Sequence, residues 1–264
     1  MNTWHNTIGR VAFINCDPLF HNLDEQWNVL AAPPAWLTGH VLRRDCIIAP
    51  IPAADYAAHH KELVLIPDIG IGSEGEVGSV LLFGARPIDE MKTIALPSDS
   101  ASSVALLKYL LKVRGLPMNY ITTGPDYELM MGRADGALLI GDRALEVAKA
   151  FPDMVRLDLG QAWMERHQLP MIFGVFVARR DTPMDRIHAA HQALLANLEG
   201  FEQNESKRDE VIRWSMERSD LSYERLNQYY GEVFNRLNPH HVDGLRTFLI
   251  EACELDGEPV FAWE

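Results

Sequence analysis

Three glycines in the first third of the chain have the spacing of a dinucleotide-binding loop. Gly70, Gly72 and Gly75 form the pattern G-x-G-x-x-G after an apolar run at residues 63–67. That pattern holds a pyrophosphate only when a helix follows it, because the helix N-terminus supplies the amides that bind the anion. Residues 78–83 are instead a short apolar run typical of a buried strand. We therefore expect no dinucleotide site, and these glycines need another role.

A serine-rich turn at residues 98–103 is a candidate anion site. Its serines are Ser98, Ser100, Ser102 and Ser103. The turn lies between an apolar run at residues 93–96 and a helical pattern at residues 104–114. Hydroxyls and free amides at the start of a helix can hold a carboxylate or a phosphate. An ordinary helix cap with solvated serines is the alternative interpretation, although four serines in six residues exceed what capping requires.

Four further residues lie where an expected strand begins or ends. Asn15 follows a strand, and its amide can donate and accept hydrogen bonds at once; a turn-forming asparagine is the alternative. Ser79 follows a flexible glycine at the start of a strand, where the backbone can approach a ligand closely; a half-buried strand serine is the alternative. Gly141 and Asp142 lie between a strand and a helix, so Asp142 belongs to a binding site or is simply a helix cap.

Histidines and cysteines give weaker indications of chemistry. The pairs at residues 59–60 and 240–241 are adjacent histidines, which point apart on a helix and lack the i, i+4 spacing of a zinc helix. Three cysteines are an odd number at no metal spacing, which favours small buried thiols over a disulfide framework. Cys16 adjoins Asn15, but the sequence supplies no evidence for an activating base. We expect no metal site.

The composition is that of a globular chain with a strong negative charge. The 264 residues are 47% hydrophobic, and the formal net charge is -13 at pH 7. No apolar run approaches the roughly 18 residues of a membrane span, and the first residues lack the pattern of a secretory signal. We expect a cytoplasmic protein that binds neither nucleic acid nor a membrane. An anionic ligand would need local donors such as helix N-termini, hydroxyls or one arginine.

The elements that must position these residues alternate between strands and helices. Strands are predicted at residues 11–14, 46–49, 63–67, 78–83, 93–96, 136–140 and 171–177. Helices are predicted at residues 104–114, 125–133 and 141–149, and the chain is helical with charged faces from about residue 184. This alternation indicates an α/β fold of two lobes with a cleft between them. Ligands of open parallel sheets bind beyond the carboxyl ends of the strands, which makes the turns described above candidate cleft residues.

Five motifs taken in order resemble the chorismate dehydratases of the futalosine route to menaquinone. They are V-A-F-I-N-C-D-P-L at residues 11–19, I-P-D-I-G-I-G at 66–72 with G-x-V-x-S-V at 75–80, S-D-S-A-S-S-V at 98–104, A-D-G-A-L-L-I-G-D at 134–142, and D-L-G-x-x-W at 158–163 with L-P at 169–170. The match runs across roughly residues 8 to 181, and the five motifs are specific as a set.

The resemblance implies both a fold and a reaction. The fold is like that of the type II periplasmic binding proteins, with two α/β lobes joined by crossover strands and a helical C-terminal segment. The reaction is the loss of water from chorismate to give 3-[(1-carboxyvinyl)oxy]benzoate, without a metal or organic cofactor. The asparagine of the family falls on Asn15, its serine after the glycine loop falls on Ser79, and its serine/threonine-rich turn falls on residues 98–103.

The expected lobes follow from this fold. Residues 1–88 and 179–264 form lobe 1, and residues 89–178 form lobe 2. The crossover segments are expected near residues 84–92 and 174–182.

Three features depart from the family pattern and put substrate contacts in doubt. His167-Gln168 stands where the family often has Thr-Gly, Phe176 ends an apolar run that often ends in tryptophan, and Asp17 adds a negative charge to the first turn. Two other functions stay open: a non-catalytic protein that binds a small organic anion, and the dihydroxynaphthoate-forming enzyme of the same pathway.

Overall fold

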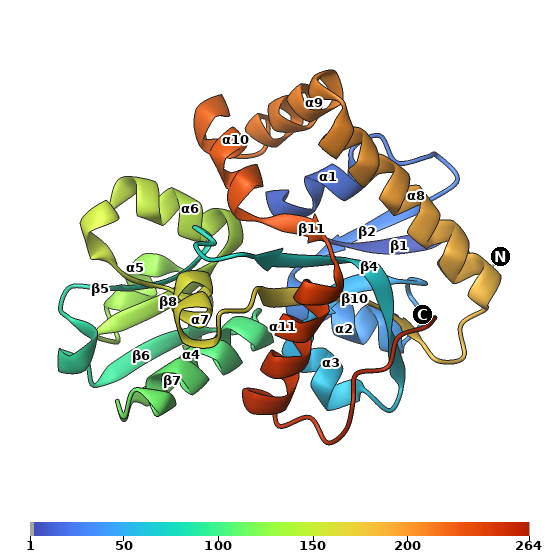
Figure 1. Cartoon of the computed structure of the whole chain (residues 1–264). Coiled ribbons are helices and arrows are strands. Elements are labelled where there is room, and N and C mark those ends of the chain that lie inside the picture. The colour runs from blue at the N-terminus through green and yellow to red at the C-terminus, as the bar shows by residue number, and fades with distance from the viewer. Residues whose placement is uncertain (1–2, 264) are drawn as a thin grey trace.

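Lobe 1 is built on two sheets (Figure 1), in the computed structural model that describes residues 3–263. The smaller sheet pairs β1 (Thr7–Val11) with β2 (Asn28–Ala32) in parallel. The larger sheet has the order β11-β4-β10-β3, and its strands are β3 (Ala49–Pro52), β4 (Leu63–Ser73), β10 (Met171–Arg179) and β11 (Phe234–Arg236). All neighbours in this larger sheet are antiparallel. The helices of this part of the chain are α1 (Asp17–Phe20), α2 (Pro34–Leu42) and α3 (Ala53–His59).

Lobe 2 is built on a separate five-stranded sheet of order β7-β6-β8-β5-β9. Its strands are β5 (Val80–Gly84), β6 (Thr93–Pro97), β7 (Asn119–Thr123), β8 (Gly136–Ile140) and β9 (Val155–Asp158). Its helices are α4 (Ala101–Val113), α5 (Tyr127–Met131), α6 (Gly141–Ala150) and α7 (Leu159–His167). Every residue of β5 and β8 is buried, as expected for central strands whose sheet is covered on both faces.

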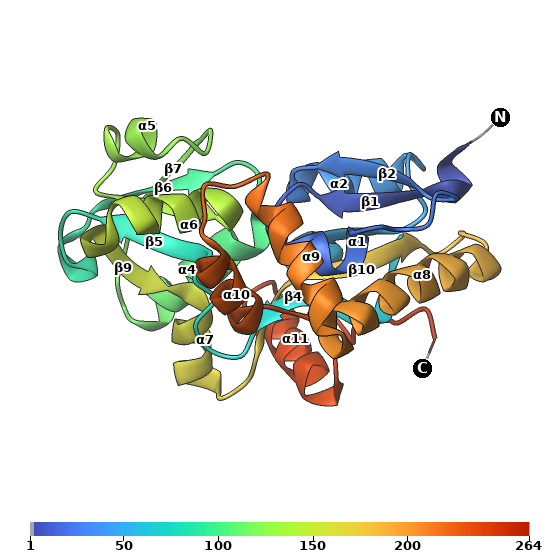
Figure 2. The same cartoon turned by 90° about the horizontal axis from the view of Figure 1, so that it is seen from above.

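Most of the C-terminal third is helical and returns to both lobes. Its helices are α8 (Met184–Gln203), α9 (Glu205–Met216), α10 (Tyr223–Glu232) and α11 (Pro239–Glu251). In Figure 2, α8 and α9 run along lobe 1, whereas α10 lies where the two lobes meet. Among residues 3–263, no helix combines the length and the apolar character that crossing a membrane requires.

Two expected strands are shifted in the structure. The strand expected at residues 11–14 is wrong, because β1 ends at Val11 and residues 14–16 form a short 3-10 helix, η2 (Ile14–Cys16). The strand expected at residues 46–49 is replaced by β3, which contains Pro50 and Pro52. β3 is one of the two edge strands of its sheet, where a proline that lacks an N–H is tolerated.

Two of the three glycines of the G-x-G-x-x-G pattern lie inside β4 rather than in a phosphate-binding loop. A Cβ atom at Gly72 would come within 2.6 Å of the Met171 carbonyl oxygen and the Phe234 ring. The bare backbone therefore lets β10 and β11 pack closely on either side of β4. As the sequence context indicated, a strand rather than a helix follows the pattern.

Strand pairing also corrects the expected lobe boundaries. β5 pairs with β8 and β9 of the lobe 2 sheet, although residues 78–84 were expected in lobe 1. β10 pairs with β3 and β4 of lobe 1, although its residues 171–178 were expected in lobe 2. We therefore propose that the chain crosses between the lobes near residues 74–79 and 168–170.

Candidate active site

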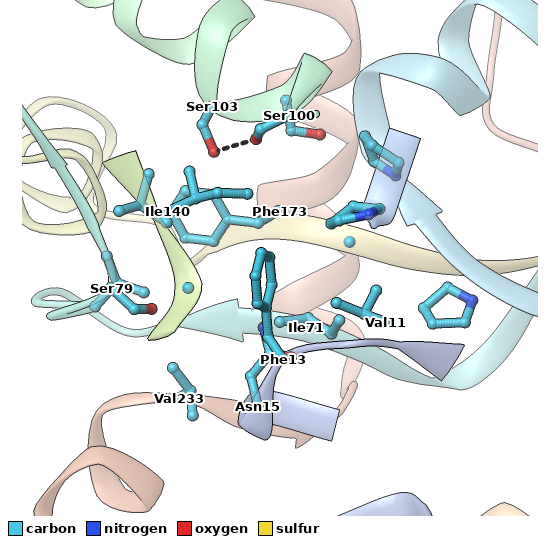
Figure 3. A pocket seen from close by; sticks show the side chains of 18 of the residues that line it. Val11, Phe13, Asn15, Ile71, Ser79, Ser100, Ser103, Ile140, Phe173 and Val233 are labelled. Carbon is cyan, nitrogen blue, oxygen red and sulfur yellow. Dashed lines mark hydrogen bonds between the residues drawn. The ribbon is translucent and has the colours of Figure 1, made fainter. Parts of the chain in front are cut away.

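A cleft lies where the lobes meet and is lined by both of them (Figure 3); its free space is about 570 Å³, counting the open solvent at its mouth. Its lining residues include Phe13 and Asn15 from lobe 1 and Ser79 from the start of the lobe 2 sheet. The remaining polar lining is Ser100, Ser102 and Ser103. Among the residues that the structure describes, each side chain that lines the cleft is apolar or an uncharged hydroxyl or amide.

Besides α2, whose first residue Pro34 also lines the cleft, three helices begin at its wall. Pro52 precedes α3, Ser100 precedes α4, and Gly141 is the first residue of α6. The N-terminus of a helix carries partial positive charge and free amides, so converging N-termini favour an anion without a cationic side chain. The cleft therefore supplies the local donors that a chain of net charge -13 needs to hold an acid.

The serine-rich turn forms the wall at the start of α4. Ser100 occupies the N-cap position, but within the described residues its side chain makes no cap hydrogen bond. Its Oγ instead donates to Ser103 Oγ over 2.8 Å. Ser102 Oγ accepts a 3.1 Å hydrogen bond from the Ala54 amide, which ties the start of α3 to the start of α4. The amides of the first α4 turn thus stay available beside three buried hydroxyls.

Asn15 lies on η2, away from the serine-rich turn in the view of Figure 3. Within the described part of the chain, its Oδ1 atom is buried and accepts no hydrogen bond. A buried carbonyl oxygen without a partner costs about 1–3 kcal/mol, so an amide in this position is suited to accept a hydrogen bond from a ligand.

Ser79 directly precedes β5, and its side chain is directed into the cleft (Figure 3). Its carbonyl oxygen accepts a 2.7 Å hydrogen bond from the Gly141 amide. The loop before it is fixed by Asp158, whose carboxylate accepts from the Gly78 amide over 2.8 Å and from the Gln161 amide over 3.0 Å. The backbone around Ser79 is thus held by β8, α6 and α7 together.

Gly141 brings an aromatic ring into the lining. Its backbone has a φ of +62°, and a Cβ atom there would meet the Phe13 ring at 2.7 Å. Only glycine combines that left-handed conformation with so close a contact. Phe13 and Phe173 both line the cleft, which gives it two aromatic rings suited to a flat, unsaturated ligand.

The structure places two expected site residues outside the cleft lining. Ser98 is exposed and does not line the cleft. The Asp142 carboxylate, in the first turn of α6, accepts a 3.1 Å hydrogen bond from the Ile14 amide and so holds η2 to lobe 2. Burial raises the pKa of Asp142 to about 6. Its position makes it a support of the Asn15 segment.

The negative charge at Asp17 is directed away from the cleft and compensated. Asp17 is fully buried beneath η2, where Arg10 Nη2 donates to it over 2.5 Å and Ser215 Oγ donates over 2.6 Å. Arg218 also donates to the same carboxylate. Burial raises the pKa of Asp17, and the two guanidinium groups oppose that shift. Two cations therefore compensate this one anion, so we do not expect Asp17 to repel an anionic ligand.

The other departures from the family pattern lie outside the cleft lining as well. His167 stacks on Trp163, with 3.9 Å between ring centroids, and Gln168 ends α7 in the left-handed conformation. Phe176 is fully buried in β10 opposite Pro50. Among the described residues, no group of three or more His, Cys, Asp or Glu side chains is placed to hold a metal ion.

Sequence reasoning missed the two aromatic rings of the lining, Phe13 and Phe173. Phe13 sits inside the motif that contains Asn15, so its position next to a candidate residue was the available signal. Arg143 on α6 was also missed: its guanidinium lies 5.3 Å from the Phe13 ring centroid and donates to Asp99 over 2.5 Å. This ion pair links the start of α6 to the turn before α4, next to the Phe13 ring.

Comparisons with solved structures identify the fold. A protein from Archaeoglobus fulgidus superposes with a TM-score of 0.77 at 17% sequence identity, over 95% of this chain and 98% of that one. A Candida albicans gene product, described as having the generic periplasmic binding protein structural fold, superposes with a TM-score of 0.66 at 13% identity, over 94% of this chain and 89% of that one. At these identities the likeness shows the fold alone, and it confirms the expected periplasmic-binding-protein-like architecture.

Comparisons of sequence identify the family. The chain is 34% identical over 192 residues to the chorismate dehydratase of Thermus thermophilus, a stretch that covers 67% of this chain and 70% of that protein. A family model described as menaquinone biosynthesis matches residues 6–254. This match spans both lobes, the cleft between them and most of the helical C-terminal segment, so the chain belongs to the menaquinone biosynthesis family.

Proposed function

We propose that this chain is a lyase that dehydrates chorismate to 3-[(1-carboxyvinyl)oxy]benzoate in the cleft between its lobes. The observation that carries the proposal is the character of the lining, which offers hydroxyls, one amide and three helix N-termini around two aromatic rings. Chorismate has an unsaturated ring and two carboxylates, so it matches both the apolar and the anion-binding parts of such a site.

One carboxylate of the substrate is bound at the start of α4. The amides of the first helical turn supply neutral donors there, together with the hydroxyl of Ser103, which accepts from Ser100 and keeps its own hydrogen. Ser79 lies elsewhere on the lining and binds a carboxylate of the same substrate. The substrate is thus held at separate points, which fixes its ring between the aromatic walls.

The chemistry is a stepwise elimination. The C–H bond beside the enolpyruvyl ether breaks first, and its electron pair spreads through the adjacent double bond onto the ring carboxylate. The neighbouring C–O bond then breaks, hydroxide leaves with the abstracted proton as water, and the ring becomes aromatic. Donors aimed at the ring carboxylate stabilise the developing charge by about 3 kcal/mol each, by analogy with oxyanion holes.

The proton acceptor in this proposal is the enolpyruvyl carboxylate of the substrate itself. Each described side chain of the lining is apolar or neutral, whereas the substrate brings its own carboxylate next to the C–H bond. The task of the protein is then to hold that carboxylate in reach of the proton, an effect of position rather than of a protein base.

Asn15 orients the substrate through its hydroxyl group. The Asn15 Oδ1 atom is a buried acceptor without a partner among the described residues, and it accepts a hydrogen bond from the hydroxyl of chorismate. The amide nitrogen of the same side chain can donate to a carboxylate at the same time. We further propose that the enzyme acts in the cytoplasm on this small molecule.

Incubation of the purified chain with chorismate tests the proposal. The expected result is a new aromatic product with the mass of chorismate less one water, detected by absorbance and mass spectrometry. Recovery of unchanged chorismate that nevertheless binds would identify a binding protein. Failure of the chain to bind or convert chorismate would overturn the proposed function.

A further inference from the structure

Tyr229 on α10 reaches across from the C-terminal segment to the cleft residue Ser79. Its hydroxyl donates to Ser79 Oγ over 3.0 Å, and both side chains are buried. The two residues are 150 positions apart in the sequence. Tyr229 does not line the cleft itself, so it acts on a ligand only through Ser79.

The direction of this hydrogen bond determines where the Ser79 hydrogen can point. A phenol has one hydrogen, and Tyr229 uses it toward Ser79 Oγ. The Ser79 hydroxyl therefore serves as the acceptor of this bond and keeps its own hydrogen for another partner. Burial raises the pKa of Tyr229, so the phenol stays protonated and remains the donor across the range in which proteins are stable.

The position of Tyr229 is fixed by the rest of α10. Arg225 and Glu232 form a paired salt bridge along the helix, with contacts of 3.2 and 3.0 Å. The next residue, Tyr230, donates to the carbonyl oxygen of Ile14 over 3.0 Å, one residue before Asn15. Two consecutive tyrosines of one helix thus reach both sides of the site. Tyr229 contacts the Ser79 side chain, and Tyr230 contacts the residue before Asn15.

We propose that Tyr229 is a positioning residue that directs the Ser79 hydroxyl hydrogen into the cleft, toward a carboxylate of the substrate. The inference rests on the proposed dehydration of chorismate. Without the phenol, the Ser79 hydroxyl is free to rotate, and part of the time its hydrogen points away from the substrate. The carboxylate then meets oxygen lone pairs, which repel it.

A double-mutant cycle tests this role. Tyr229→Phe removes one hydroxyl and keeps the ring, and it should lower kcat/KM for chorismate by about tenfold, the scale of one hydrogen bond to a charged group. Ser79→Ala should lower kcat/KM by at least as much. In the Ser79→Ala background, the further change Tyr229→Phe should have less than about a twofold effect, because its target is already absent.

Tyr56→Phe is the matched control. Tyr56 is also fully buried, and its hydroxyl also has a hydrogen-bond partner, the Val260 amide at 2.8 Å, but it does not line the cleft. Both single variants lose one buried hydroxyl, so both should lose similar stability in urea. Only Tyr229→Phe should lose turnover, whereas Tyr56→Phe should keep kcat/KM within about twofold of the wild type.

Independent, additive losses from Tyr229→Phe and Ser79→Ala would overturn the positioning role. If Tyr229→Phe is unstable, the four proteins of the cycle are compared in a stabilising osmolyte in which all of them are folded, and a further loss above about threefold in the Ser79→Ala background contradicts the proposal. Wild-type turnover is measured first in the same assay. An inactive wild type refutes the proposed function and this inference with it, whereas an active wild type with additive losses refutes the role of Tyr229 alone.

Discussion

Replacing Asn15 by aspartate separates a catalytic role of this residue from a role in turn formation. The two side chains have nearly the same shape, and both favour turns, so a turn-forming residue tolerates the change. A residue that contacts a substrate with two carboxylates does not tolerate it. The buried, unpaired Oδ1 atom of Asn15 favours the second case.

Two effects set the expected loss of activity. The variant loses a donor to a charged group, which costs about 1.5–3 kcal/mol. It also places a negative charge next to a dianion. At about 5 Å and an effective dielectric constant of about 20, the repulsion between two unit charges is about 3 kcal/mol. Together these terms lower kcat/KM by roughly a thousandfold or more, since about 1.4 kcal/mol corresponds to a factor of ten.

The assay compares turnover and stability on the same preparations of three proteins. Asn15→Ala loses the amide without gaining a charge, so it should lose only about 10- to 100-fold in kcat/KM. Asn15→Asp should be less active than Asn15→Ala, because only the aspartate adds a negative charge beside the substrate. Both variants should unfold in urea within about 2 kcal/mol of the wild type. A folded Asn15→Asp protein with kcat/KM within about threefold of the wild type would refute the reasoning.

Three further variants test the support of the cleft. Gly141→Ala should lower both stability and turnover, because the new Cβ atom strains a backbone with a φ of +62° and meets the phenyl ring of the lining at 2.7 Å. The control Gly115→Ala has a φ of +69° and no atom within 4 Å of the new Cβ, so it should lose stability but keep turnover. Equal activity of the two variants would contradict this prediction. The pKa of Asp142 is raised from 3.8 to about 6 by burial, so the folded state holds this proton more tightly than the unfolded state does. The contribution of this proton to the free energy of unfolding is therefore complete below about pH 4 and is lost as the pH rises through about 6. Over that range, the free energy of unfolding of Asp142→Asn in urea should rise relative to that of the wild type by up to about 3 kcal/mol. Parallel pH curves for the two proteins would argue against the raised pKa. Ser103→Ala should weaken chorismate binding by about 1–3 kcal/mol in calorimetric titration, and the exposed control Ser98→Ala should leave it unchanged; identical affinities would reduce the serine-rich turn to a helix cap.

The sequence predicted three central strands of lobe 2, β5, β6 and β8, but missed β7 and β9 there and β2 and β11 in lobe 1. Residues 93–96 and 136–140 are short apolar runs bounded by polar turns, and they correspond to β6 and β8. In lobe 1, apolar residues continue beyond the strands, because Ile14 and Cys16 are buried in η2 and Ile47 and Ile48 are buried before β3. Burial alone does not distinguish a strand from a buried turn, which explains the shifts.

Residue types at strand ends indicated most of the cleft lining, because the carboxyl ends of strands and the starts of helices meet there. Asn15, Ser79, Ser100 and Ser103 line the cleft as the turn chemistry suggested. Tyr229 could not be found in this way, since its contact with Ser79 depends on how α10 packs against lobe 2 and no local pattern encodes that.

The neutral lining of the cleft has a consequence for how fast the substrate arrives. A chain with net charge -13 repels a dianion at long range, and no cationic side chain of the described lining offsets this repulsion at the entrance. Added salt screens repulsion beyond about 10 Å but leaves short, buried hydrogen bonds nearly unchanged. The association rate of the substrate should therefore rise with ionic strength while its dissociation rate stays nearly constant. An enzyme that captured the same carboxylates with exposed arginines would show the opposite salt dependence.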